Sequence, residues 1–375
     1  MKIGGLMADI KYWIGFNIVP GIGPAKFRAL IDHFGDLEAA WRADAHKLRE
    51  AGLDRRAIEN LLATRAGISL DEEVERVARR GAHVLTWEDA AYPPQLHNIY
   101  NPPPLLYVKG QILPEDEWAV AVVGTRRATV YGREATRQIA GDLARNRITI
   151  VSGLARGIDA QAHHAALEVG GRTIAVLGCG IDIIYPPENR KLAEEIVERG
   201  ALITEYPLGT PPEGGNFPPR NRIISGLALG TLIVEAGEDS GALITADYAL
   251  EQGREVFAVP GNIFNRGSGG TNKLIQQGAK LVLSAQDVLE ELNLTMVSQQ
   301  MEVREVVPEN ETESILLKYI SSEPIHVDEI KQATGLPMAT VSSTLAMMEL
   351  KGMVRQVGGM NYILARESRV EYVVD

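Results

Sequence analysis

Residues 119–153 read AVAVVGTRRATVYGREATRQIAGDLARNRITIVSG, and this stretch decides the fold. Two short β-branched or apolar runs, Ala119–Gly124 and Ile148–Gly153, flank a segment of helical length, Tyr131–Asn146. Nearly continuous apolar runs are typical of strands that helices cover on both faces. The stretch therefore predicts a strand, a right-handed crossover helix and a second, parallel strand.

The same alternation of strand and helix continues as far as residue 260. Four more strands are expected at Thr173–Gly178, Ala201–Glu205, Thr231–Glu235 and Glu255–Pro260, and two short ones before them at Ala82–Trp87 and Leu105–Val108. The remaining helices are expected at Gly157–Val169, Pro187–Arg199, Asn221–Leu229 and Ser240–Gly253. Residues 69–290 therefore predict an α/β domain with an extended, Rossmann-like and mostly parallel sheet.

The segments on either side predict two smaller domains. Residues 1–68 are helical in pattern, and the turn Gly21-Ile22-Gly23 lies between two apolar-periodic stretches. This turn fits either a helix-hairpin-helix, whose glycines approach a phosphate, or a plain helical hairpin, and the sequence leaves both open. Residues 291–311 are polar and predict a linker. Residues 312–375 predict three helices and a β-hairpin, which is the pattern of a winged helix.

Composition restricts the class of protein. The net charge of -11 over 375 residues argues against a generic nucleic-acid binder. Residues 119–280 nevertheless hold 17 Lys and Arg, 14 of them Arg, against 17 Asp and Glu, which allows local basic grooves. The single cysteine, Cys179, fits a reducing compartment, and we see neither a signal peptide nor a run of about 18 apolar residues. We expect a cytoplasmic protein that does not interact with membranes.

Glycine residues, residues with a hydroxyl group and arginines follow the expected strands at the point where each strand ends. The carboxyl ends of parallel strands meet at one edge of a sheet, where ligands of such folds bind. Backbone N–H groups of glycine, helix N-termini and the guanidinium groups of arginine all bind phosphates. Their repetition along the edge indicates a strand of nucleic acid. Phe217, beside Arg220, is a candidate for base stacking. The alternative for Phe217 is a buried plug under its loop.

Enzymatic chemistry finds less support in the sequence. No Gly-x-Gly-x-x-Gly opens the first crossover, and no Gly-x-x-x-x-Gly-Lys-[Ser/Thr] occurs. His163 and His164 are adjacent and would point about 100° apart on a helix, which disfavours a shared metal ion. Asp159 is expected to cap a helix or to anchor an arginine, and a catalytic pair of Cys179 with His163 is the least favoured alternative. We predict no catalytic residue, no metal and no cofactor.

Six motifs, in order and at consistent spacing, resemble the DprA/Smf (DNA-processing protein A) family. They are GTR at 124–126 with YG at 131–132, SGLARGID at 152–159 with AH at 162–163, GID at 180–182 with YP at 185–186, FPPRNRII at 217–224, SGALITA at 240–246 and VPG at 259–261. The resemblance covers nearly the whole chain and is closest over residues 119–285.

This resemblance implies a homodimer, without known catalysis, that binds single-stranded DNA at the sheet edge. It also implies a role in natural transformation, in which the protein protects incoming DNA and helps to load the RecA recombinase. The DNA-binding residues carried over by motif are Gly124, Thr125, Arg126, Arg156, Phe217, Arg220, Asn221, Arg222, Ser240, Gly241 and Lys273. The resemblance further places Leu274 and Ile275 near the dimer surface.

Two features qualify these expectations. Family members often carry a Lys or Arg in the loop before Phe-Pro, whereas residues 212–216 read PEGGN, which should weaken phosphate attraction and flatten the salt dependence. The expected recognition helix, Met338–Leu350, contains no Lys or Arg. We therefore expect the C-terminal module to bind protein, or to pack against its own dimer, rather than to read duplex DNA, and a transcription regulator is disfavoured.

One enzymatic alternative remains, a nucleotide phosphoribohydrolase on a related Rossmann-like fold. Such enzymes place a Gly-Gly-x-Gly-Thr loop and a catalytic Glu near the sheet edge. Here Gly269-Gly270-Thr271 and Glu235 are a partial echo of that arrangement, and Glu235 could equally neutralise an arginine.

Overall fold

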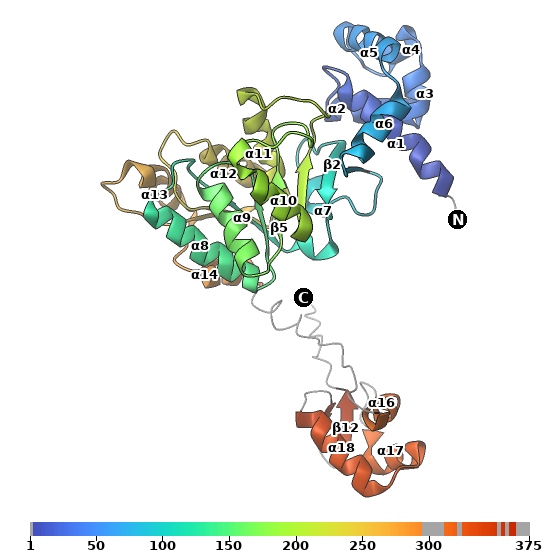
Figure 1. Cartoon of the computed structure of the whole chain (residues 1–375), viewed down its shortest axis with the longest axis vertical. Coiled ribbons are helices and arrows are strands. Elements are labelled where there is room, and N and C mark those ends of the chain that lie inside the picture. Colours follow the sequence, from blue (N-terminus) through green and yellow to red (C-terminus); the bar gives the residue numbers. More distant parts are fainter. Residues whose placement is uncertain (1–2, 295–310, 321–324, 351–353, 357–359, 365–375) are drawn as a thin grey trace, which may run out of the picture. The chain divides into compact units, whose positions relative to one another are not determined.

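The computed structural model describes residues 3–294, 311–320, 325–350, 354–356 and 360–364. The chain divides into two compact units, Met1–Leu294 and Thr295–Asp375 (Figure 1). The larger unit contains the N-terminal helices and a nine-stranded sheet, and the described residues of the smaller unit form three helices and a three-stranded sheet. Most of the expected linker at 291–311 lies outside the described residues.

The large sheet is mostly parallel, as predicted, with the strand order β1-β2-β6-β5-β4-β3-β7-β8-β9. β1 and β2 extend it by antiparallel pairing, and the other neighbours pair in parallel. The strands are β1 His83–Thr86, β2 Leu105–Gly110, β3 Ala119–Val123, β4 Thr149–Ser152, β5 Thr173–Val176, β6 Ala201–Thr204, β7 Gly230–Ile233, β8 Glu255–Ala258 and β9 Lys280–Leu281. Sequence reasoning missed only β9, which is too short to leave a pattern.

Helices cover both faces of this sheet because its connections run in two directions. The chain moves outward from β3 through β4 and β5 to β6, then returns to β7 on the other side of β3. Right-handed crossovers place the helices of the outward path on one face and those of the return path on the opposite face. The outward helices are α8 Val130–Arg145, α9 Ile158–Glu168 and α10 Arg190–Arg199; the return helices are α11 Phe217–Gly226 and α12 Ala242–Glu251.

Helix α11 begins at Phe217, four residues before the predicted start at Asn221. Two prolines, Pro218 and Pro219, follow that first residue. Proline is tolerated in the first turn of a helix, where an N–H group has no intrahelical acceptor in any case. The early start places Phe217 at the helix end beside the carboxyl edge of the sheet.

The remaining helices of the larger unit are shorter. They are α7 Pro94–His97, α13 Gly269–Gln276 and α14 Ala285–Glu291, with 3-10 turns at Pro114–Glu117, Pro187–Asn189, Gly214–Asn216 and Arg266–Ser268. No helix in the described part of the chain is long and apolar enough to cross a membrane.

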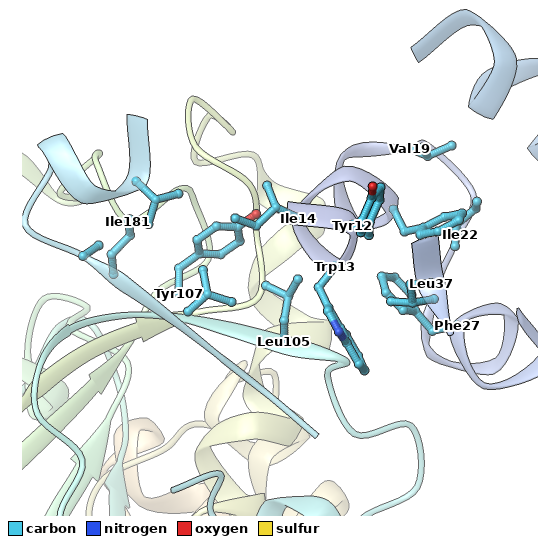
Figure 2. Packing of buried hydrophobic residues seen from close by; sticks show 14 of the residues in the cluster. Tyr12, Trp13, Ile14, Val19, Ile22, Phe27, Leu37, Leu105, Tyr107 and Ile181 are labelled. Atoms are coloured by element: carbon cyan, nitrogen blue, oxygen red, sulfur yellow. The ribbon is translucent and has the colours of Figure 1, made fainter. Parts of the chain in front are cut away.

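The N-terminal helices share a hydrophobic core with the sheet. They are α1 Ile3–Ile18, α2 Pro24–Phe34, α3 Leu37–Arg42, α4 Ala45–Glu50, α5 Arg55–Gly67 and α6 Leu70–Arg79. Trp13 and Phe27 lie in one buried cluster with Leu105 and Tyr107 of β2 (Figure 2). The hydroxyl of Tyr107 also donates to Asn17 Oδ1 at 3.1 Å. This end of the sheet is therefore covered by residues from the start of the chain.

The turn between α1 and α2 is stabilised from within the chain. Gly21 has φ +86°, a left-handed conformation that favours glycine. Lys26 Nζ donates to Gly21 O at 2.8 Å and pairs with the Asp54 carboxylate at 2.5 Å. Both interpretations of the turn stay predictions, because a helix-hairpin-helix contacts a phosphate through backbone N–H groups and not through this lysine.

The smaller unit has the arrangement expected of a winged helix. Its helices are α16 Glu311–Leu317, α17 Val327–Thr334 and α18 Met338–Leu350, and its sheet has the antiparallel order β10-β12-β11, with β10 Ile325–His326, β11 Val354–Gln356 and β12 Asn361–Leu364. Leu316, Ile330 and Leu345 are fully buried between these elements. The predicted helices and hairpin are thus present.

Candidate functional site

A hollow lies at the carboxyl edge of the sheet, beyond the ends of β3, β4 and β5. It is lined by residues of the loops after these strands and of the first turn of α11: Arg126, Gly153, Ala155, Arg156, Tyr185, Pro186, Phe217 and Arg220. Four of these residues, Arg126, Arg156, Phe217 and Arg220, were predicted from the sequence. The topology of the sheet thus brings together side chains that are up to 94 positions apart in the chain.

Phe217 is held in place from several directions and is only half-buried. Its ring lies against Gly178, where a Cβ atom would come within 2.8 Å of the ring. The guanidinium carbons of Arg126 and Arg220 lie 5.6 and 5.8 Å from the ring centre, within the range of a cation–π contact. The ring of Tyr185 is 5.7 Å away and tilted by 34°. The ring is therefore packed where it meets Gly178 but is not fully buried, so the buried-plug alternative accounts for only part of its surroundings.

Arg220 braces the floor of the hollow. Its side chain is buried, and Nη1 donates to the carbonyl oxygens of Gly153, at 2.9 Å, and Val176. These two acceptors follow or end β4 and β5, so one guanidinium connects two strand ends to α11. Burial lowers the pKa of Arg220 to about 10, and Asp159 opposes this shift. The guanidinium therefore stays charged at neutral pH.

The carboxylate of Asp159 lies beneath the same loop. It accepts hydrogen bonds from the backbone N–H groups of Gly153 at 3.2 Å and Ala155 at 3.4 Å. Burial raises the pKa of Asp159, and the charge of Arg220 opposes that rise. Asp159 thus positions the backbone after β4 and faces a buried cation, which leaves it poorly placed to react with a ligand.

The loop after β3 presents Arg126 to the hollow. Thr125 N donates to Glu235 O at 2.7 Å, which attaches this loop to the end of β7. A Cβ atom at Gly124 would approach Ile158 Cγ1 to 2.6 Å, so only glycine allows this close packing. Beyond this anchored backbone, the side chain of Arg126 is exposed.

Arg156 lies on the solvent side of the hollow. It is exposed, and its Nε donates to the carboxylate of Glu188. The paired Glu188 follows Tyr185-Pro186 in the loop that leads to α10. A phosphate that approaches Arg156 therefore has to compete with a carboxylate of the same chain.

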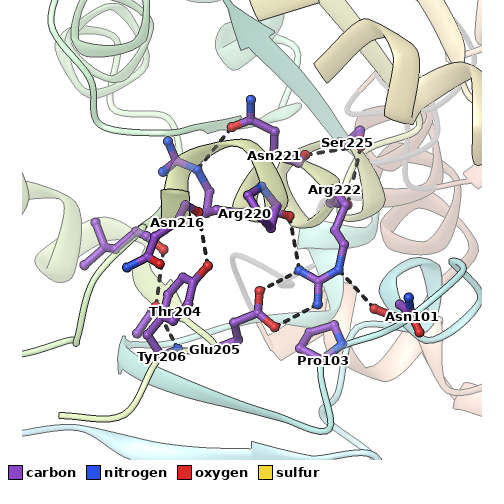
Figure 3. A network of polar contacts seen from close by, with 12 residues as sticks. Asn101, Pro103, Thr204, Glu205, Tyr206, Asn216, Arg220, Asn221, Arg222 and Ser225 are labelled. Carbon is purple, nitrogen blue, oxygen red and sulfur yellow. Dashed lines mark hydrogen bonds and ion pairs between the residues drawn. The ribbon is translucent and has the colours of Figure 1, made fainter. Parts of the chain in front are cut away.

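Neither Arg222 nor Asn221 lines this hollow, although Asn221 Oδ1 accepts a hydrogen bond from Arg220 Nε at 3.3 Å. Arg222 forms a two-pronged ion pair with Glu205, at 2.6 and 2.7 Å, and donates to Asn101 O at 3.1 Å (Figure 3). Asn221 Nδ2 donates to Gly241 O at 3.4 Å. Successive helical residues are rotated by about 100°, so Arg220 and Arg222 face opposite sides of α11. Their closeness in the sequence does not reveal that the side chains of Arg220 and Arg222 point in opposite directions.

Three other predicted residues lie around a second hollow, between α12 and α13. Ser240, Gly241 and Lys273 line it together with Glu238, Asp239 and Asp247. Three carboxylates against one ammonium make this surface acidic. The structure does not bring these three predicted phosphate donors to the hollow that holds Arg126.

Leu274 and Ile275, predicted near a dimer surface, pack against the core of their own sheet. Leu274 is buried in the cluster that contains β8 and α12, and Ile275 is partly buried against it. Neither side chain forms an open apolar face.

Sequence reasoning did not identify Tyr185 as a lining residue. Its ring is exposed to 39% and lies beside Phe217. The available signal was its position in the loop that follows β5, because every other lining residue also follows a strand or begins α11.

The buried nucleophile and histidine near the hollow are poor candidates for catalysis. Burial raises the pKa of the Cys179 thiol to about 11, so the thiolate is scarce at neutral pH. Burial lowers the pKa of His163 to about 3, and its Nδ1 lies 2.6 Å from Thr173 Oγ1. Among the described residues, no group of three or more His, Cys, Asp or Glu has an arrangement that could hold a metal ion.

Two family models match the chain. The model described as DNA recombination-mediator protein A matches residues 83–293, and the DprA winged helix domain matches residues 304–360. The chain belongs to the DprA family of DNA recombination-mediator proteins. Its DprA relatives include Protein Smf of Escherichia coli, 40% identical over 87% of this chain and 88% of that protein, and Protein Smf of Synechocystis, 37% identical over 95% and 98%.

Solved DprA structures agree with the fold. DNA processing protein A of Streptococcus pneumoniae superposes with a TM-score of 0.67 at 36% identity, and covers 75% of this chain and 97% of that one. DNA processing protein A of Helicobacter pylori gives a TM-score of 0.51 at 33% identity over 56% and 96%, and that structure concerns a single-stranded DNA binding mode.

Proposed function

We propose that the chain binds single-stranded DNA at the hollow beyond β3, β4 and β5. We further propose that it acts as a recombination mediator, which protects incoming DNA and helps to load RecA during natural transformation. The observation that carries the proposal is the half-buried ring of Phe217, flanked by the guanidinium groups of Arg126 and Arg220. The DprA relative from Helicobacter pylori, whose structure concerns single-stranded DNA, supports it.

The chemistry of the hollow suits a single strand better than a duplex. An aromatic platform stacks on an unpaired base of any kind, and nearby cations attract the phosphates. In a duplex the bases are stacked on each other, so their faces are not available to Phe217. Binding at this hollow should therefore discriminate strongly between single and double strands and weakly among sequences.

The alternative, a nucleotide hydrolase, depends on Glu235, and the geometry disfavours it. Glu235 is 2% exposed, and its Oε2 accepts from Thr129 N at 2.9 Å. A Cβ atom at Gly132 would come within 2.1 Å of the same oxygen. A carboxylate enclosed this tightly by α8 holds the loop after β3 in place and leaves no room for a substrate.

The further properties expected of the family form part of this proposal. A homodimer, a contact with RecA, a cytoplasmic location and the absence of catalysis are all compatible with the geometry described above. Helix α18, which carries no Lys or Arg, supports a protein partner or a dimer contact for the C-terminal unit. Loss of DNA binding on deletion of residues 312–375 would contradict that assignment.

The test of the proposed function is salt-dependent binding of a fluorescent oligo-dT, compared with a duplex of equal length. The wild type should prefer the single strand. Arg126→Ala should weaken that binding about tenfold and reduce the slope of log affinity against log salt by about 0.7. Arg145→Ala, at the far end of α8, is the matched control and should behave as the wild type. A wild type that fails to bind the single strand at low salt would overturn the proposal.

Removal of the Glu188 carboxylate should strengthen DNA binding. Glu188→Gln frees Arg156 from its internal partner and removes one negative charge beside the hollow. Because both side chains are exposed, we expect a gain in affinity of only two- to fivefold. Titration at low salt measures it. Equal affinities of Glu188→Gln and the wild type would show that Arg156 does not contact the strand.

A further inference from the structure

Four exposed apolar side chains lie on two segments beyond the carboxyl ends of β3 and β8, the first turn of α8 and the loop after β8, which a hydrogen bond from Tyr131 to Pro260 joins. They are Val130, 76% exposed, Tyr131, 51%, Ile263, 81%, and Phe264, 90%. We call these four residues the β8 patch. Exposure of a single large apolar residue is ordinary, but four at one place mark a candidate binding surface.

The backbone under the β8 patch is firmly held. The hydroxyl of Tyr131 donates to Pro260 O at 2.7 Å, which joins the start of α8 to the end of β8. Asn272 forms two hydrogen bonds with the backbone of Gly261, at 3.1 and 3.0 Å. Phe264 N donates to Asn262 Oδ1 at 2.9 Å. A stacking surface on a fixed loop loses little conformational entropy when a ligand binds.

The patch is continuous with the proposed DNA site. A single loop, residues 124–129, runs from Gly124 past Arg126 to the start of α8, where Val130 and Tyr131 lie. β8 lies two strands from β3, which corresponds to about 10 Å across the sheet. A strand bound at Phe217 and Arg126 can therefore reach the patch within a few nucleotides.

The charges around the patch suit a polyanion. Arg127, Arg133 and Arg266 are exposed on the loop after β3, on α8 and on the loop after β8, respectively. Arg133 Nη1 donates to Ala128 O at 2.7 Å, which directs this guanidinium toward the same loop. The exposed carboxylate of Glu238 lies on the other side, at the approach to α12. A strand would thus reach Phe264 along the α8 side.

We propose that the β8 patch is a second base-stacking station for the same single strand, with Phe264 as its principal platform. The proposal rests on the proposed function and extends it, because it assigns a path that leads from Phe217 past Arg126 and Arg127 to Phe264. Aromatic side chains interleaved with arginines are the means by which proteins hold single strands without regard to sequence. Arg127, an exposed residue of the loop after β3, lies on this path.

Binding of oligo-dT of increasing length to the full chain tests the second station. Phe264→Ala should leave the affinity for the shortest oligonucleotides that bind the wild type unchanged, and should weaken binding of longer ones about five- to tenfold. Tyr100→Ala removes an aromatic ring of similar exposure, 88%, outside the patch and should match the wild type at every length. Phe264→Trp should restore long-oligonucleotide affinity, and its added fluorescence should be quenched by long but not by short strands.

The outcomes separate the second station from the proposed function. If the wild type binds no single strand, both fail. If it binds and Arg126→Ala is weakened, but Phe264→Ala equals the wild type at all lengths, only the second station fails. If Phe264→Ala instead disturbs self-association of the chain, with DNA binding intact, the patch is a protein-binding surface and the proposal is overturned.

Discussion

Phe217→Ala should weaken binding of oligo-dT by about ten- to a hundredfold, the largest loss expected from any single change at the hollow. A base stacked on an aromatic ring contributes about 1–3 kcal/mol. The substitution also removes the ring that the guanidinium groups of Arg126 and Arg220 face, so both cations lose their common neighbour. The measurement is a fluorescence anisotropy titration at two salt concentrations.

The salt dependence separates stacking from charge in this variant. Phe217→Ala keeps every arginine, so the slope of log affinity against log salt should remain close to that of the wild type. Phe217→Tyr preserves the ring and should bind nearly as well as the wild type. An affinity for Phe217→Ala within twofold of the wild type would show that the ring serves only to pack against Gly178.

Arg220→Met should lower the free energy of unfolding by about 3–5 kcal/mol. A buried ion that loses its partner is strongly destabilising, and Asp159 would then face an apolar side chain. The carbonyl oxygens of Gly153 and Val176 would lose their donor as well. Urea unfolding, followed by tryptophan fluorescence, measures the effect.

The loss should depend on pH. Burial already raises the pKa of Asp159 above its usual value, and Arg220 limits that rise. Without Arg220 the folded-state pKa rises further. A group with a raised folded-state pKa contributes stability that is present below its unfolded pKa and disappears as the pH rises through its folded pKa. Arg220→Met should therefore be less destabilised at about pH 5 than at about pH 8.

A second substitution tests whether Asp159 is the cause. Arg220→Met combined with Asp159→Asn removes the unpaired carboxylate, so the double variant should be more stable than Arg220→Met alone near pH 8, and its pH dependence should be reduced. Stabilities that simply add would mean that the two buried groups do not interact. Arg145→Ala, with its exposed ion pair to Asp142, should stay within about 0.5 kcal/mol of the wild type.

The architecture of the sheet was predictable because buried parallel strands leave a strong pattern. The run at β3 is apolar along its whole length, the run at β4 is apolar or β-branched up to Ser152, and each is followed by glycine. The antiparallel strands β1 and β2 were also located, whereas β9, with two residues, has no periodicity to detect. Local composition thus indicated where the strands lie, and the right-handedness of the crossovers indicated which face of the sheet each helix covers.

The candidate site was predictable only in part. Arg126 follows β3 and Phe217 begins α11, both at the expected edge of the sheet, so the topology of the sheet brings them together. The direction of a helical side chain is harder to assign, since Arg222 lies two residues from Arg220 and yet pairs with Glu205. Lys273 was grouped with the phosphate donors by motif, but its helix faces three carboxylates across a different hollow. These outcomes depend on contacts between distant segments.

The core that the N-terminal helices share with β2 bears on how this protein could change in evolution. The family match begins at residue 83, after the last of these helices, yet Trp13 and Phe27 belong to the same buried cluster as Leu105 and Tyr107. A lineage that exchanged or shed the first 80 or so residues would have to supply a new apolar cover for β2 at the same time. The unit that depends on this shared core is therefore larger than residues 83–293, which the family model matches.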